Sequence, residues 1–154
     1  MTTTTGRKTR QDGQGDEMSA TLTIIIPMTP PLVLGPNRGQ GKGKGRYQAK
    51  DAEAALKIAT IGAISNARAA YDGRMPEPLF CGPVDCQITV YRRKGAKIWD
   101  GDNLNAACKR AVFDVFQAKG IVSNDRQLQV LPPKWDRDPD GDGYMVVDLT
   151  EANP

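Results

Sequence analysis

The alternation and spacing of apolar residues divide the chain into short strands and two helices. The β-branched run Thr21–Pro27 and the alternating segment Val84–Tyr91 predict two strands, because every second side chain of a strand faces the core. A short strand is expected at Gln127–Leu131, where two prolines follow, and a last strand at Tyr144–Thr150. The pattern therefore predicts four strands, separated by stretches of other character.

Helical spacing appears in two segments. Helix-forming residues dominate between Gln48 and Ala70, and their apolar positions fall on one face. The second segment begins at Asp102 with apolar positions at i, i+3, i+4 and i+7, and Gly120 supplies a typical C-terminal stop. The order β-α-β-α-β-β predicts an α+β fold: a small mixed β-sheet with two helices packed on it.

The composition along the chain predicts one domain and one tail. Residues 1–19 are rich in Thr, Gly and Gln and predict a disordered N-terminal tail, whereas residues 20–154 suffice for a single domain. The tail lacks the apolar core of a signal peptide, and no apolar run approaches the ~20 residues needed to cross a bilayer. A cytoplasmic protein with no membrane partner is therefore expected.

The absence of histidine excludes several classes of enzyme. With no histidine in the sequence, Ser-His-Asp and Cys-His catalysis and most zinc chemistry are excluded. The three cysteines, Cys81, Cys86 and Cys108, form no C-x-x-C pair, which argues against a cysteine metal site. A metal would have to be held mainly by oxygen atoms, which favours Mg²⁺, Mn²⁺ or Ca²⁺.

Charge is distributed unevenly and indicates a polyanionic partner. Residues 1–135 carry 20 Lys and Arg against 12 Asp and Glu, whereas residues 136–154 carry one Arg against six acids. A glycine-rich segment, expected to be a loop, and a turn before the second helix hold two basic clusters that we expect to contact DNA. Their residues are Arg38, Lys42, Lys44 and Arg46, and Arg92, Arg93, Lys94 and Lys97. Taken singly, each cluster is more often a solvated loop, but two of them near a pair of carboxylates favour a contact with DNA.

The segment Trp99–Leu104 holds two carboxylates at the start of the second helix. Asp100 and Asp102 are separated by one glycine, so both can point at one cation. An alternative is that Asp102 only caps the helix, because Asp is a preferred cap. Asp125 lies in the turn after the helix and precedes a strand that can return it to the pair. Three such carboxylates predict a metal site for phosphodiester hydrolysis.

A lysine on the second helix strengthens the same hypothesis. Lys109 lies about 20° round the helix from Asp102 and about 10 Å along its axis, given 100° and 1.5 Å per residue. A long lysine side chain at that place can reach a phosphate bound at the start of the helix. The alternative is a solvated surface lysine.

The acidic segment 136–141 matches the first half of a calcium-binding EF-hand loop. The twelfth position of that loop should be glutamate and is Val147 here, and the flanking helices are missing from the pattern. The sequence Asp-Pro-Asp-Gly is better interpreted as the turn of a hairpin that joins the last two predicted strands. A small calcium-binding module is therefore a remote alternative.

Three blocks of the sequence resemble the RusA family of crossover-junction endodeoxyribonucleases, small resolvases of bacteria and their phages; a phage or prophage member is expected. The blocks span most of residues 20–150. They are IPMTPPLVLGPNRG (26–39), WDGDNLNAACKRAVFDVF (99–116) and GIVSNDRQLQV (120–130).

The resemblance implies a Mg²⁺- or Mn²⁺-dependent homodimer that resolves four-way (Holliday) DNA junctions by paired cleavage, without a small-molecule cofactor. It implies metal ligands at Asp100, Asp102 and Asp125, and a functional lysine at Lys109, with Arg110 as the rival cation. Asp114 matches a later aspartate of the family, but on a uniform helix it lies about 120° round from Asp102, which favours a structural role.

Two other functions fit the same residues. A nuclease selective for flaps or forks would use the same carboxylates, and a non-catalytic DNA-binding protein would use the acids only as helix caps. Trp99 is interpreted as a core residue, with stacking on an unpaired base as the alternative.

Overall fold

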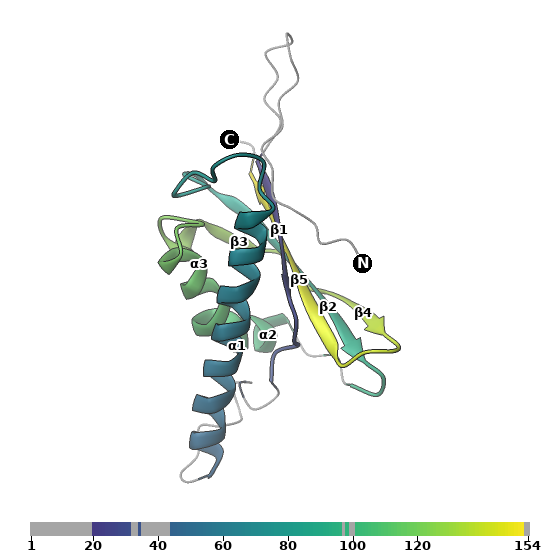
Figure 1. The fold of residues 1–154 in the computed structure, drawn as a ribbon. Coiled ribbons are helices and arrows are strands. Elements are labelled where there is room, and N and C mark those ends of the chain that lie inside the picture. The colour runs from purple at the N-terminus through teal and green to yellow at the C-terminus, as the bar shows by residue number, and fades with distance from the viewer. Residues whose placement is uncertain (1–19, 32–33, 35–43, 97, 99–100, 153–154) are drawn as a thin grey trace.

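A computed structural model describes residues 20–31, 34, 44–96, 98 and 101–152 (Figure 1). Five strands and two long helical segments make up the fold. Their bounds are β1 Thr21–Ile26, α1 Lys44–Ala69, β2 Val84–Arg93, α2 Gly101–Cys108, a π-helical turn Lys109–Phe113, α3 Asp114–Ala118, a 3₁₀ turn Asp125–Gln127, β3 Leu128–Val130, β4 Lys134–Asp138 and β5 Gly143–Glu151. Within these ranges, none of the helices is long and apolar enough to cross a membrane.

The strands form one mixed sheet in the order β1-β5-β2-β3, with β4 also paired to β2. β5 is antiparallel to both β1 and β2. β3 and β4 are parallel to β2 and share one of its edges, β3 beside Val84–Cys86 and β4 beside Thr89–Arg93. The prediction of a mixed α+β fold is confirmed.

The core lies between one face of the sheet and the helices, which Figure 1 shows together on one side of it. Alternate residues of β2 are fully buried there, as the alternating sequence predicted. The side chains that fill this layer come from every part of the chain. The largest fully buried ones are Phe80, Phe116, Leu22, Ile24, Ile26, Leu56, Ile64, Ile88, Leu104, Ile121, Met145 and Leu149.

The prediction of a hairpin between the last two strands is wrong. The structure contains a further strand, β4, and β2 lies between β4 and β5. The Asp-Pro-Asp-Gly turn therefore crosses the end of β2, where Gly143 pairs with Arg92. Gly143 has a φ of 98°, and its N–H donates to Asp138 Oδ2 at 3.1 Å. The acidic segment thus joins two strands, not the two helices of an EF-hand.

The second helical segment contains a π turn that the periodicity did not predict. The Asp114 N–H donates to the Lys109 carbonyl, five residues back instead of four. Three consecutive residues of the turn, Ala111, Val112 and Phe113, are buried. A regular α-helix spreads three consecutive residues over about 200°, which is wide for one buried face. The added residue lets the segment bury all three and still return Phe116 to the core.

Candidate functional site

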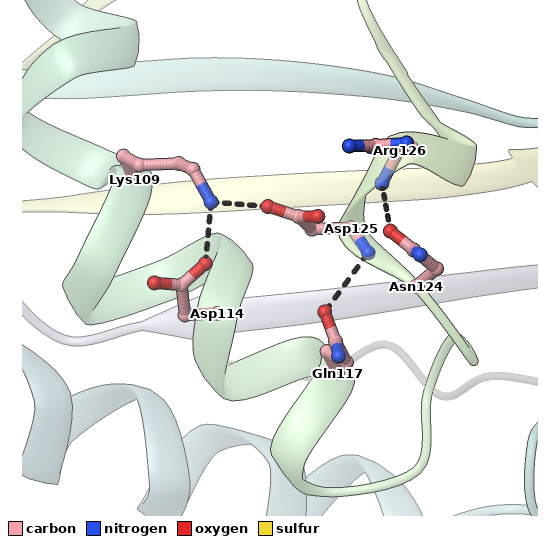
Figure 2. A network of polar contacts seen from close by, with 6 residues as sticks. All are labelled: Lys109, Asp114, Gln117, Asn124, Asp125 and Arg126. Atoms are coloured by element: carbon pink, nitrogen blue, oxygen red, sulfur yellow. Dashed lines mark hydrogen bonds and ion pairs between the residues drawn. The ribbon is translucent and has the colours of Figure 1, made fainter.

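Lys109 lies at the centre of a charged network that joins the π turn to the 3₁₀ turn (Figure 2). Its Nζ donates to Asp114 Oδ1 at 2.6 Å and also pairs with Asp125 Oδ2. The Lys109 side chain is 53% exposed and that of Asp125 24% exposed. The network is therefore open to solvent and to a ligand.

The π turn explains why Asp114 joins this network. In a regular α-helix, residues five apart lie about 140° from each other, but one i→i+5 turn brings them to the same side. When the extra residue of the π turn is left out of the count, the angle between Asp102 and Asp114 about the helix axis is only about 20°. The expectation of 120°, and of a merely structural Asp114, rested on uniform helix geometry. On this geometry Asp102, Lys109 and Asp114 fall on one side of the helix, with Asp102 about 17 Å from Asp114 along the axis.

The backbone around Asp125 is held by neighbouring side chains (Figure 2). Asn124 caps the 3₁₀ turn: its Oδ1 accepts from the Arg126 N–H at 2.9 Å. The Asp125 N–H donates to Gln117 Oε1 on α3 at 3.1 Å. Asp125 follows the helix and precedes β3, as the sequence predicted, but nothing in the sequence pattern singled out Gln117.

Gln127 attaches this turn to the segment that leads into β2. Its Nε2 donates to the carbonyl oxygens of Phe80 at 3.0 Å and Gly82 at 2.7 Å. Its Oε1 accepts from the N–H groups of Ser123 at 2.7 Å and Asn124 at 3.0 Å. Four hydrogen bonds from one amide fix the turn in space and thereby the position of Asp125.

Opposite charges in the network shift the pKa values of both partners. The hydrogen bond from Lys109 holds the pKa of Asp125 below its ordinary 3.8, against a smaller desolvation effect. Hydrogen bonds to Asp114 and then Asp125 raise the pKa of Lys109 above 10.5. The positive charge of Arg126 lowers the pKa of Asp125 further, so the acids of the network face two cations.

The pKa of Asp125 is expected to rise when Lys109 is replaced by methionine. A lowered pKa means that Asp125 stabilises the fold fully above pH 3.8 and loses this contribution as the pH falls through its folded-state value. NMR titration of the Asp125 carboxyl carbon should give a midpoint below 3.8 in the wild type and a higher one in Lys109→Met. The neighbouring variant Arg110→Met is the control. A midpoint that is equal in all three proteins would contradict the ion pair.

The structure describes only one of the two other proposed metal ligands. Asp102 lies in the first turn of α2 and is exposed, and Asp100 lies outside the described residues. Across the residues that the structure places, no group of three or more His, Cys, Asp or Glu side chains is close enough to hold a metal ion. Asp114 and Asp125, which both face Lys109, offer carboxylate oxygens of the kind that suits a hard divalent cation.

The basic clusters differ from the expected loops. Arg92 and Arg93 belong to β2, and Lys94 lies in the turn that follows. β4 places Asp136 beside Tyr91 and Asp138 beside Arg93, so acids from the end of the chain adjoin this cluster. A run of charged residues in the sequence reveals its own charge, but not the charge of the residues that the fold places beside it. We therefore expect this cluster to attract DNA less than its sequence implies.

The structure describes the basic cluster of the glycine-rich segment only from Lys44 onward, where α1 begins. Lys44 and Arg46 lie in the first turn of α1, where the sequence predicted a loop as far as residue 45. Arg38, Lys42 and Lys97, and also Trp99, lie outside the described residues. Of the two adjacent cations on the second helix, Lys109 is the one that pairs with carboxylates in the described part of the chain.

Comparison with protein-family models finds no match for this chain, and comparison with curated proteins finds none either. The likeness to the RusA family therefore rests on the three sequence blocks alone.

Proposed function

We propose that the chain is a metal-dependent endodeoxyribonuclease that cuts branched DNA, with four-way junctions as its substrate. The observation that supports this most is the charged network of Lys109, Asp114 and Asp125. Carboxylates and a lysine gathered at a solvent-open position suit the hydrolysis of a phosphodiester, and histidine is not needed for it.

Each residue has a distinct task in this proposal. Asp100, Asp102 and Asp125 would hold Mg²⁺ or Mn²⁺, and Asp114 would hold Lys109. The metal supplies Lewis acidity toward the phosphate and a lower pKa for a bound water molecule. Lys109 keeps Asp114 and Asp125 together while no other cation is bound. With Asp125 engaged by a metal, the Lys109 ammonium group would be available to neutralise charge on a phosphate oxygen.

A homodimer belongs to the same proposal. A four-way junction has approximate two-fold symmetry, and two copies of the chain related by a two-fold axis would present one active site to each of two strands. Paired nicks at symmetric positions are the expected product.

One feature favours a second candidate, a non-catalytic DNA-binding protein. The Lys109 pairs already link the helix to the turn that carries Asp125, so they suffice as a structural brace. On this alternative the acids do not touch substrate, and DNA binding is independent of metal.

A cleavage assay on a labelled synthetic four-way junction separates the two candidates. We expect symmetric nicks with Mg²⁺ or Mn²⁺, none with EDTA, and none in Asp102→Asn, which should still bind the junction. Duplex, flap and fork substrates of equal length measure selectivity, and preference for a flap or fork would redirect the proposal to that substrate. Junction binding without cleavage under either metal would leave the non-catalytic candidate.

A further inference from the structure

A pocket of about 550 Å³ lies where the C-terminal end of α1 meets the segment before β2, built from residues outside the charged network. Two arginines and one glutamate provide its charge, and a buried methionine provides an apolar wall. The lining residues are Arg68, Gly73, Arg74, Met75, Pro76 and Glu77. With two guanidinium groups and one carboxylate, the lining of the pocket has a net formal charge of +1.

Arg68 is held in place but not fully satisfied. One terminal nitrogen donates to the Lys119 carbonyl at 2.6 Å and lies 3.3 Å from Glu77 Oε1. Its Nε atom is buried and has no hydrogen-bond partner. A buried donor without an acceptor is unfavourable, so the position of Arg68 must be held by its other contacts.

We propose that this pocket binds the oxyanion of a phosphate group, with Arg68 and Arg74 as its two cationic contacts. The planar guanidinium groups of two arginines match the oxygens of a phosphate. Met75 and Pro76 add an apolar wall against which the ring carbons of a deoxyribose could pack. Glu77 weakens the site by its negative charge.

The position of the pocket connects it with the proposed nuclease. The Lys119 carbonyl that holds Arg68 is two residues beyond Gln117, which holds Asp125. Both sites are thus attached to the end of α3. If the proposed function is right, the phosphate belongs to a DNA backbone, and the pocket is a second contact for a strand whose other phosphate is cut at the charged network.

The inference is tested first by NMR of arginine side chains in the full chain. Addition of inorganic phosphate, and separately of a 5′-phosphorylated dinucleotide, should shift the Nε–H signals of Arg68 and Arg74, and leave that of Arg137 on β4 in place. Arg74→Gln should abolish the shift at Arg68. A shift with inorganic phosphate that the dinucleotide does not produce would confirm an oxyanion site and assign it to small phosphates. No shift with either probe would overturn the inference.

Junction binding in EDTA then tests the DNA source without requiring cleavage. Arg74→Gln should weaken binding several-fold and lower the slope of log affinity against log salt by about 0.9, the value for one lost phosphate contact. Glu77→Gln should strengthen binding, and Arg137→Gln, which removes the same charge elsewhere, should leave the slope unchanged. These effects in a protein that never cleaves DNA would support the pocket and refute only the nuclease. An unchanged slope in Arg74→Gln, with cleavage intact, would refute the DNA contact alone.

Discussion

Replacing Asp125 with asparagine is expected to lower metal-dependent junction cleavage by roughly 100-fold or more, the scale on which a directly acting electrostatic group contributes to catalysis. The side chain keeps its shape but loses the negative charge that attracts a cation. Lys109 retains Asp114 as a partner, and Asn124, Gln117 and Gln127 still hold the turn, so the fold should be preserved.

The measurement is a single-turnover cleavage rate at saturating protein, with Mg²⁺ varied over a wide range. Asp51→Asn, an exposed position on α1 outside the network, is the matched control and should cleave like the wild type. Equal melting temperatures for the three proteins would tie the loss to chemistry. An Asp125→Asn protein that cleaves at nearly the wild-type rate would remove Asp125 from the proposed active site.

Replacing Gln127 with alanine is expected to destabilise the protein by about 2–4 kcal/mol, because four hydrogen bonds of a partly buried amide are lost together. For a domain of this size, the melting temperature should fall by roughly 7–14 °C. Gln129→Ala is the control, because Gln129 is exposed on the neighbouring strand β3 and should lose little.

Thermal unfolding followed by circular dichroism measures both glutamine variants. The local consequence can be separated from the global one at low temperature, where Gln127→Ala is still folded. There, hydrogen exchange at the amides of Ser123 and Asn124 should accelerate, because both lose their acceptor. Equal stability of the two variants would show that the turn is held by other contacts.

The pattern of apolar residues predicted most of the fold because burial has a simple period in each element. The alternation in Val84–Tyr91 corresponds to the buried face of β2, and Gly120 does end the second helix, with a φ of 75°. β4 was missed because its sequence, KWDRD, carries four charges in five residues. An edge strand paired on one side only need not show an apolar period, and its existence depends on β2 beside it.

Two residues of the charged network were singled out from the sequence, but the geometry of the network was not predicted. Lys109 and Asp125 followed from position along the chain, and the structure brings them together. Asp114 was misplaced because helical spacing assumes 100° per residue throughout. The consecutive buried residues Ala111–Phe113 were the available sign of a π turn. Gln117 carries no local signal, since its role arises only when the chain folds back after α3.

The π turn also bears on how such sites are related by descent. If the helix lacked the extra residue of this turn, the aspartate would follow the lysine by four positions. The two side chains would then still lie on the same side of the helix. The loss or gain of a single codon could therefore leave the Lys109–Asp114 pair and both flanking helices in place. Related proteins that keep the same site are therefore expected to differ in length by one residue between positions 109 and 114. A sequence alignment that allows no gap there would fail to match the aspartates of the two proteins.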